Sequence, residues 1–448
     1  MKITISSILT TLWLSLALNL SCTNRHKQVA PPPPVKERIK LKKVNVYLDA
    51  SASNAGYYEG STDFKNKVSS LLTQLNTNNE FLDSNKGVTI EVFWISDQDI
   101  SSYGHGKDVV AKFLNESGTV NNAHQKSSTI DQYFDLVMRN TDSSTISILV
   151  SDCILSYPDS VIHINPDKNK QDADNGDLKN KTKISIAGEF GNEEKRPAFA
   201  VYAYLSPFNG TYYNYKNLPV KKQNLFDRPF YIWILTRDKD VLADFTNQVM
   251  SYKDLEPANQ MSFGLIQDDR QTYTILPQLK RYGKWSPAGK LGLRKVVLDN
   301  RNTKLVFTLC VDLSGPSKKW TIEELNKYLV TSSKNNSCKF QARFLPKDSI
   351  TQEDIKKHLS SGDKSVYNNT SHLLEVTVTE FLADEDTLMI TMPFVYPEWY
   401  KQWSIHDDLD IESIENKTFA FDQIILAFLE TMKDDKKKII NINIPITK

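Results

Sequence analysis

The chain has 448 residues, of which 40% are hydrophobic and 24% are charged, a composition typical of folded globular proteins. Its 55 lysines and arginines almost equal its 54 aspartates and glutamates, so the formal net charge of +1 gives no general attraction to nucleic acid or anionic lipid. Four cysteines are too few for a disulfide scaffold, and the seven histidines show no zinc-ligand spacing. The length favours two or three domains, and the composition argues against a nucleic-acid-binding protein and a zinc enzyme.

The first segment has the pattern of a signal peptide. Met1 and Lys2 precede an uncharged, mostly apolar run over 3–20 that ends at Ser21-Cys22. A small residue directly before a cysteine at the end of such a run resembles the lipobox of bacterial lipoproteins. The resemblance implies removal of residues 1–21 and lipidation of Cys22. An uncleaved membrane anchor is the alternative, because the apolar run is close to the shortest membrane span.

Residues 22–40 are expected to form a tether. They contain few apolar side chains, and the run Pro31 to Pro34 favours an extended polyproline segment. The expected location is therefore the bacterial cell envelope, facing the periplasm or the surface, with only the covalent lipid in the membrane. Outside the cytoplasm a disulfide between Cys310 and Cys338 becomes permissible, and two free thiols are the equal alternative.

Residues 42–252 alternate predicted strands and helices. Apolar runs predict strands and helical spacing predicts helices: strands over 44–49, 88–95, 146–150, 198–205 and 230–235, and helices over 64–75, 130–138 and 241–250. Because several strands are continuous apolar runs, the pattern indicates an α/β fold with a doubly wound, mostly parallel sheet covered on both faces. Ligands of such sheets lie beyond the carboxyl ends of the strands.

Oxygen-bearing side chains follow two of these strands. The first strand ends in Asp49-Ala50-Ser51-Ala52-Ser53, and the third ends in Ser151-Asp152. The first loop places a carboxylate and two hydroxyls on one side of a turn, and a neighbouring strand end can add the second carboxylate. Hard oxygen ligands with open positions suit Mg²⁺ or Mn²⁺.

This arrangement resembles the von Willebrand factor A-type domain and its metal-ion-dependent adhesion site, over residues 42–252. In that family two serines ligate the metal, the aspartates act mainly through water, a threonine of another loop adds a ligand, and a partner's carboxylate fills the open position. The matching positions here are Asp49, Ser51, Ser53, Asp152, and either Ser128 or Thr129. Where the family usually has a glycine after the last aspartate, this chain has Cys153. The alternative is a degenerate site whose serines only cap a helix.

Enzymatic interpretations of these residues are weaker. A haloacid dehalogenase-type phosphatase needs an aspartate where Ser51 stands, and no Gly-x-Ser-x-Gly elbow is present. Between the third and fourth strands, residues 160–195 are interpreted as a solvated insertion, most simply a surface loop. The aromatic residues Phe208, Tyr212, Tyr213 and Tyr215 fit either a ligand-facing surface or strand-edge packing.

Residues 258–448 are expected to form a second, β-rich domain, best described as a β-sandwich. Strands are predicted over 272–276, 305–313, 339–344, 373–380, 387–395 and 440–446, without regular helices between them. One helix is predicted over 418–432, with an apolar stripe that indicates core packing. The two halves are expected to fold separately, with a boundary near 252–260.

Together these features predict a non-catalytic envelope lipoprotein that binds a protein or another carboxylate-bearing partner through a divalent metal ion. The first alternative is a scaffold component of an envelope complex whose metal site is vestigial. The second is a metal-assisted hydrolase, which would lack a base other than Asp49 and Asp152.

Overall fold

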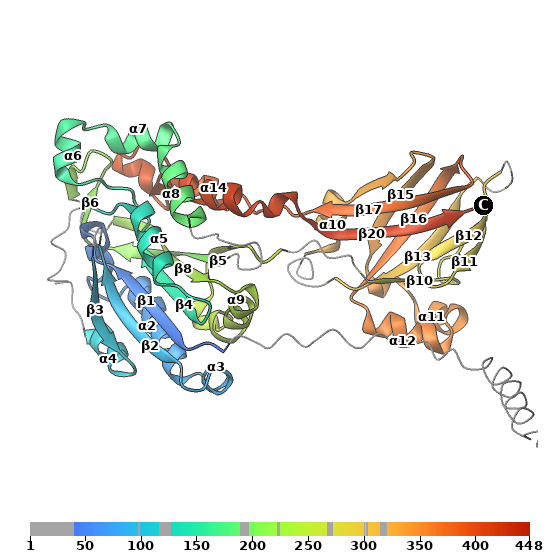
Figure 1. Cartoon of the computed structure of the whole chain (residues 1–448), viewed down its shortest axis with the longest axis horizontal. Coiled ribbons are helices and arrows are strands. Elements are labelled where there is room, and N and C mark those ends of the chain that lie inside the picture. Colours follow the sequence, from blue (N-terminus) through green and yellow to red (C-terminus); the bar gives the residue numbers. More distant parts are fainter. Residues whose placement is uncertain are drawn as a thin grey trace, which may run out of the picture. The chain divides into compact units, whose positions relative to one another are not determined.

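The computed structural model describes residues 40–96, 99–115, 127–188, 197–221, 225–266, 272–299, 301, 303–313 and 320–448 (Figure 1). The predicted signal peptide, the predicted lipidation site Cys22 and, apart from Lys40, the predicted tether lie outside these residues. Within the described part of the chain, no helix is long and apolar enough to cross a membrane.

The first region is built on a seven-stranded sheet in the order β3-β2-β1-β4-β8-β5-β9. The strands in this order are Ile100–His105, Thr89–Ile95, Lys43–Asp49, Thr145–Ser151, Leu225–Thr236, Ala198–Phe208 and Asn259–Phe263. Only β2, β1 and β4 are parallel to one another; β3, β8, β5 and β9 pair antiparallel with their neighbours. The expected α/β class is confirmed, but the expected mostly parallel sheet is wrong. The chain returns from β5 to β8 without a crossover helix, and such short connections join antiparallel strands.

One face of this sheet is covered by helices that precede residue 252 in the chain. They are α2 (Asp63–Thr77), α3 (Asn79–Ser84), α4 (Asp108–Asn115) and α9 (Lys239–Phe245). Alternate residues of β1, Val44, Val46 and Leu48, are fully buried on this face. Helix α2 begins where the Thr62 side chain accepts a hydrogen bond from the Lys65 amide, and its buried residues repeat at helical spacing.

The opposite face carries α5 (Ile130–Arg139), α8 (Asp177–Ala187) and α14 (Phe421–Met432). The interpretation of 160–195 as a surface loop is wrong, because the segment contains α6 (Asp159–Ile164), α7 (Lys168–Asp174) and α8. Leu178 and Ile186, two helical turns apart, are buried and place α8 between α5 and α14.

Helix α14 belongs to the core of the first sheet although it comes from the second half of the chain. The Phe428 ring stacks on Trp233 of β8 at 4.6 Å between centroids and meets Phe199 of β5 edge-on at 4.9 Å. The sheet also takes its last strand, β9, from residues beyond 252. Core packing for this helix was predicted, but its place on the first sheet was not.

The second region is mostly β, as predicted. One sheet has the order β10-β13-β16-β15 and the other β11-β12-β20-β17-β14. The first comprises Tyr273–Leu276, Leu305–Val311, His372–Phe381 and Cys338–Leu345, and the second Lys284–Ala288, Gly292–Val297, Lys438–Thr447, Glu385–Pro393 and Val330–Ser333. Short helices α10 (Ile322–Tyr328), α11 (Gln352–His358) and α12 (Ser361–Asn369) interrupt the strands, and α13 (Trp399–Gln402) follows them.

Cys310 and Cys338 are both free thiols. Each lies on a strand beside β16, where Cys310 pairs with Leu373 and Cys338 with Phe381. Eight residues of extended strand span about 27 Å, so these two cysteines are far beyond disulfide distance.

Candidate functional site

The two carboxylates predicted from the sequence lie at the same edge of the sheet. β1 and β4 are parallel neighbours, Asp49 is the last residue of β1, and Asp152 directly follows β4. Ser51 and Ser53 follow Asp49, and the chain turns there into the short 3₁₀ helix η1 (Ala52–Tyr57). This shared carboxyl edge is the place at which the sequence analysis predicted the site.

Asp49 is held firmly by hydrogen bonds to both carboxylate oxygens. Its Oδ1 accepts from the Ser51 amide at 2.8 Å and from the Tyr133 hydroxyl at 3.2 Å. Its Oδ2 accepts from the Ser151 hydroxyl at 2.6 Å. Asp49 therefore organises the loop, while its oxygens have little capacity left for a direct ligand bond.

The serine hydroxyls and Asp152 present oxygens that suit a small divalent cation. Ser51 Oγ and Ser53 Oγ share a hydrogen bond of 3.0 Å, and the Asn54 side-chain amide donates to Ser51 Oγ at 3.1 Å. The same 3.0 Å separation is close to the distance of about 2.9 Å between adjacent ligands of octahedral Mg²⁺. Asp152 Oδ1 accepts from the Ile154 amide at 3.1 Å, whereas Oδ2 is buried and has no hydrogen-bond partner among the described residues. An unpaired buried carboxylate oxygen is costly unless a cation compensates it.

The two candidates for a further ligand lie at the start of α5. The Ser128 hydroxyl donates to the Ile154 carbonyl, and its backbone pairs with Ser156, so the loop after Asp152 is tied to this segment. Thr129 is buried and precedes the first residue of α5. The segments carrying all six predicted ligand candidates thus gather at one edge.

Burial governs the acid strength of the two carboxyl groups. Burial, and then the neighbouring Asp152 carboxylate, raise the pKa of Asp49 to about 7. Burial also raises the pKa of Asp152, although the charge of Arg228 and hydrogen bonds act against it. Burial thus disfavours the ionised form of both carboxyl groups, and a bound cation would favour that form.

Arg228 of β8 is the charged group that sequence analysis missed. Its side chain is 1% exposed, and none of its three side-chain nitrogens has a hydrogen-bond partner in the described part of the chain. The guanidinium carbon lies 4.3 Å from the Tyr212 ring centre and 5.1 Å from that of Phe208. Although burial acts to lower it, nearby tyrosines and the Asp152 and Asp408 carboxylates raise the pKa of Arg228, so it remains charged.

A hairpin between β5 and β8 covers the loop that carries the serines. The hairpin consists of β6 (Thr211–Tyr213) and β7 (Pro219–Lys221). Its backbone approaches so closely that a Cβ on Gly210 would lie 2.6 Å from Gly56 Cα, and the Asn209 amide donates to the Gly56 carbonyl at 3.0 Å. Ser53, at 7% exposed, is the most accessible of the six predicted ligand candidates. The site is closed in this structure.

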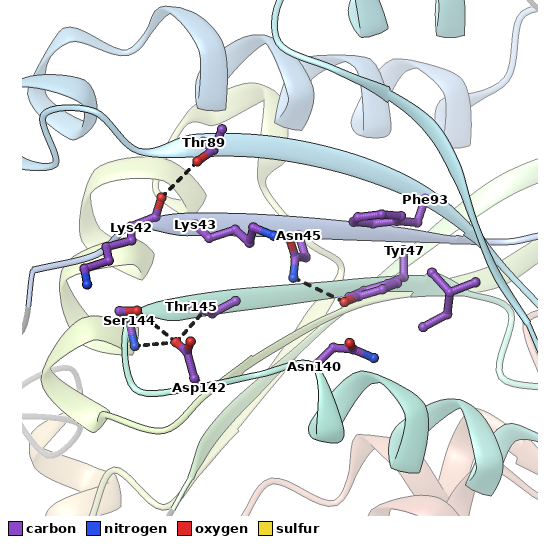
Figure 2. A pocket seen from close by; sticks show the side chains of 11 residues that line it. Lys42, Lys43, Asn45, Tyr47, Thr89, Phe93, Asn140, Asp142, Ser144 and Thr145 are labelled. Atoms are coloured by element: carbon purple, nitrogen blue, oxygen red, sulfur yellow. Dashed lines mark hydrogen bonds between the residues drawn. The ribbon is translucent and has the colours of Figure 1, made fainter.

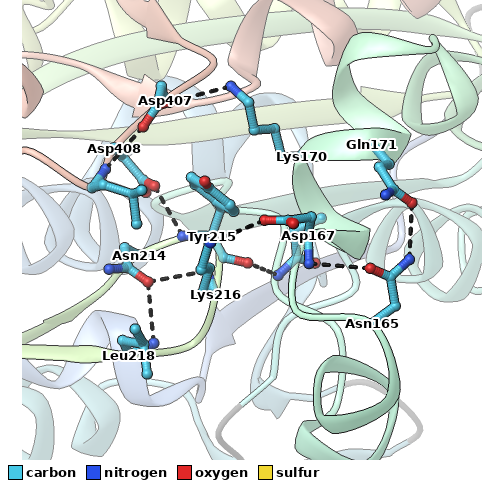
Figure 3. A network of polar contacts seen from close by, with 12 residues as sticks. Asn165, Asp167, Lys170, Gln171, Asn214, Tyr215, Lys216, Leu218, Asp407 and Asp408 are labelled. Atoms are coloured by element: carbon cyan, nitrogen blue, oxygen red, sulfur yellow. Dashed lines mark hydrogen bonds and ion pairs between the residues drawn. The ribbon is translucent and has the colours of Figure 1, made fainter.

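Polar contacts fasten the hairpin turn from two sides (Figure 3). The Asp408 carboxylate accepts hydrogen bonds from the Tyr212 hydroxyl and, at 2.9 Å, from the Tyr215 amide. On the other side Lys216 forms an ion pair of 3.2 Å with Asp167 of the inserted helices. The aromatic residues Phe208, Tyr212 and Tyr215 are buried in this cover, which favours packing over a ligand-facing surface.

A separate pocket of about 530 Å³ lies at the other end of the same strands (Figure 2). Its lining includes the stacked rings of Tyr47 and Phe93, and Asn45, whose Oδ1 has no partner among the described residues. Lys43 at its rim is paired with Glu91 at 2.9 Å. The pocket contains none of the predicted ligand residues, and ligands of parallel strands bind at the opposite, carboxyl end.

Comparison with protein-family models, with curated proteins and with solved structures found no match to this chain. Within the described residues, no cluster of three or more histidine, cysteine, aspartate or glutamate side chains could hold a metal. A metal at the carboxyl edge would therefore depend on hydroxyl ligands beside its two carboxylates.

Sequence reasoning missed the groups that surround the ligand candidates. Tyr133 and Ser151 hold Asp49, while Arg228 and Asp408 bring further charges to the edge. Arg228 carried no clear signal, because charged residues such as Lys43 and Lys304 also stand next to apolar strand runs of this chain. Asp408 carried none, since it comes from a segment remote in sequence.

Proposed function

We propose that this protein is a non-catalytic, metal-dependent binding protein of the bacterial cell envelope. The observation that carries the proposal is the Ser51–Ser53 hydroxyl pair, 3.0 Å apart, at the same sheet edge as the unpaired Oδ2 of Asp152. Ser51, Ser53 and either Ser128 or Thr129 would hold Mg²⁺ or Mn²⁺ directly, and Asp49 and Asp152 would act mainly through water. When bound, the metal supplies a Lewis-acidic position for a carboxylate of the partner.

The balance of buried charge supports a dication. Asp49, Asp152 and Asp408 supply three carboxylates at this end of the sheet, and Arg228 supplies one cation. Ionised together, they leave an excess of two negative charges in surroundings that solvate charge poorly. A divalent ion compensates this excess, whereas a monovalent ion compensates only half of it.

The folds of both regions fit the same proposal. Three parallel strands with helices on both faces, and the site at their carboxyl edge, support an A-type domain. The antiparallel strands β5, β8 and β9 depart from a mostly parallel sheet. The apolar residues of the two facing β-sheets support a β-sandwich for the second region, with Trp285 of one sheet meeting Phe307 of the other at 5.9 Å.

Binding rather than catalysis is inferred from the state of the site. Asp49 uses both oxygens as hydrogen-bond acceptors, and the ligand candidates are buried under the β6–β7 hairpin. A substrate would need access to water and to an unengaged base. A partner's carboxylate needs only one open position, although the cover must move for the partner to reach it.

Titration of the purified mature protein with Mg²⁺ and Mn²⁺, by calorimetry and thermal unfolding, tests the metal site. We expect saturable binding and, at a metal concentration of 100 times Kd, a stabilisation of about 2.7 kcal/mol that a chelator removes. Ser53→Ala removes one hydroxyl from the site and should weaken metal binding by at least about tenfold. Ser101→Ala on exposed β3 is the matched control and should bind as wild type does.

A second candidate function is a scaffold component with a vestigial metal site. The buried, charged Arg228 favours it, because a guanidinium beside Asp152 can supply part of the positive charge that a metal would bring. This candidate predicts no saturable metal binding and an unfolding temperature that chelator leaves unchanged. Metal binding that is equal in wild type and Ser53→Ala would contradict the assigned ligands.

The envelope location is tested at Cys22, which lies outside the described residues. We expect mass spectrometry of the mature protein to find an acylated cysteine at its N-terminus, and Cys22→Ser to leave an unprocessed or soluble form. A mature wild-type protein that lacks the acyl group would refute the lipid anchor.

A further inference from the structure

The guanidinium of Arg228 carries N–H donors that have no acceptor among the described residues. A guanidinium has five N–H donors in a planar fork that matches a carboxylate. In this structure none of the three nitrogens makes a hydrogen bond within the described residues, although the side chain is 1% exposed. The Tyr212 and Phe208 rings hold the guanidinium in place. A buried charge with all its donors unpaired is costly, which makes it a site for an anion.

Arg228 and Asp408 contact the same side chain: the guanidinium carbon lies 4.3 Å from the Tyr212 ring centre, and the Tyr212 hydroxyl donates to the Asp408 carboxylate. Asp408 comes from a segment about 180 residues further along the chain, between α13 and α14. Its carboxylate does not hydrogen-bond to Arg228 and instead accepts from the Tyr212 hydroxyl and the Tyr215 amide. Asp408 is therefore a carboxylate of this chain that sits beside the guanidinium and fastens the hairpin over the site.

The segment around Asp408 combines exposed and buried contacts. Lys170 of α7 donates to the His406 carbonyl at 2.7 Å and lies 3.5 Å from the exposed Asp407 carboxylate. Leu409, directly after Asp408, is 44% exposed, whereas Asp408 itself is buried. The exposed contacts contribute little each, but an acidic partner must replace the buried hydrogen bonds of Asp408 with its own contacts.

We propose that Arg228 is the specificity-determining residue for the partner's carboxylate, and that Asp408, which fastens the hairpin beside Arg228, blocks this carboxylate's place until the partner binds. The inference rests on the proposed function for the class of partner, an acidic one. It adds that two groups bind the partner's carboxylate, the metal ion and the guanidinium. It also adds that the segment 406–410 is autoinhibitory, because it blocks partner binding. Binding then replaces one buried carboxylate by another, so the charge of the site is conserved.

The experiment measures a defined carboxylate probe on the purified mature protein. The probe is a capped hexapeptide with one aspartate, and its asparagine counterpart is the control peptide. With Mg²⁺ present, Asp408→Asn should tighten aspartate-peptide binding by about fivefold or more, because it removes the competing charge. Asp83→Asn changes an exposed carboxylate of α3, outside this segment, and should leave the affinity unchanged. Hydrogen exchange of residues 209–221 should rise in Asp408→Asn and not in Asp83→Asn.

Two further variants keep the test decisive. If Asp408→Asn does not fold, Tyr212→Phe removes the hydroxyl that holds Asp408 and retains the ring that supports Arg228, and it should tighten binding in the same direction. Arg228→Lys in the Asp408→Asn background keeps the charge but loses the planar fork, and it should abolish the gain. Equal peptide affinity in wild type, Asp408→Asn and Tyr212→Phe would overturn the inference.

The metal titration separates this inference from the proposed function. Saturable Mg²⁺ binding without any gain in Asp408→Asn refutes the role of Asp408 and Arg228 and leaves the metal site standing. A gain that persists in chelator, in a protein that binds no Mg²⁺, refutes the metal-dependent function and supports Arg228 as the carboxylate receptor on its own.

Discussion

The two ends of strand β4 place aspartates in opposite surroundings. Asp152, after its carboxyl end, is completely buried, and burial raises the pKa of this carboxyl group. Asp142, just before its amino end, is exposed and accepts hydrogen bonds from the Ser144 amide and hydroxyl and from the Thr145 hydroxyl. Its slight burial acts to raise the pKa, but these bonds outweigh it and lower the pKa.

The comparison shows at which end of the sheet the carboxylates lack compensating hydrogen-bond donors and positive charge. At the amino end local donors and solvent satisfy the carboxylate, and Lys42 adds a favourable charge. At the carboxyl end the chain buries three carboxylates with one guanidinium and leaves an oxygen of Asp152 without a partner among the described residues. A further positive charge, such as the proposed metal ion, would therefore stabilise the carboxyl end more than the amino end.

The largest expected effect is that of Arg228→Met. The substitution keeps much of the side-chain volume but removes the buried cation at this edge, so Asp152 and Asp408 lose their compensating charge. We expect a loss of about 3–5 kcal/mol in the free energy of unfolding at neutral pH, measured by denaturant titration. Arg139→Met breaks a surface ion pair with Asp135 and should cost at most about 1 kcal/mol. An equal loss in the free energy of unfolding in both variants would contradict a special role of Arg228 in compensating the carboxylates at the carboxyl end.

A smaller, pH-dependent effect is expected for His406→Gln, in the segment that carries Asp408. The His406 ring bonds Asp174 of α7 and Asp422 of α14, each at 2.8 Å, and these carboxylates, Asp422 first, raise the pKa of His406 to about 9. A raised histidine pKa stabilises the fold fully below its unfolded value of 6.5, and the contribution disappears as the pH rises through about 9.

We therefore expect His406→Gln to lower the free energy of unfolding by about 1–2 kcal/mol at pH 6 and to match wild type above pH 9.5. The measurement is a series of denaturant titrations across this range. His105→Gln, at the exposed end of β3, is the control and should show no such difference. A pH-independent effect of His406→Gln would assign the residue a packing role only.

The sequence was sufficient for the parts of the site that are local. The Asp49 to Ser53 loop follows an apolar strand, and Asp152 follows another, so their meeting at one edge needed only that β1 and β4 be parallel neighbours. Strand existence was also predictable for β5 and β8, because apolar runs reveal burial. Their direction was not, since it depends on the hairpin between them.

The remainder depended on contacts between distant segments. Nothing local to Phe428 indicates that its ring packs on Trp233, almost 200 residues earlier. The helices of 160–195 were missed because lysines and aspartates dominate the segment, and the buried face of α8 has few apolar residues: Leu178 and Ile186, with the polar Thr182 between them. Asp408 could be connected with Arg228 only through the tertiary structure.

The smallest expected effect tests the amino end, with Asp142→Asn. An asparagine oxygen can still accept from Ser144 and Thr145, but the charge that strengthens these bonds is lost. Because Asp142 is exposed, the loss in the free energy of unfolding should stay below about 1 kcal/mol.

A depressed carboxyl pKa stabilises the fold above the unfolded value of 3.8, and this contribution is lost as the pH falls through the lower, folded value. Wild type and Asp142→Asn should therefore differ at pH 6 and converge in more acidic solution than pH 3.8 in denaturant titrations, with exposed Asp83→Asn as the control. A loss as large as that of Arg228→Met would show that the amino end is under the same electrostatic demand as the carboxyl end.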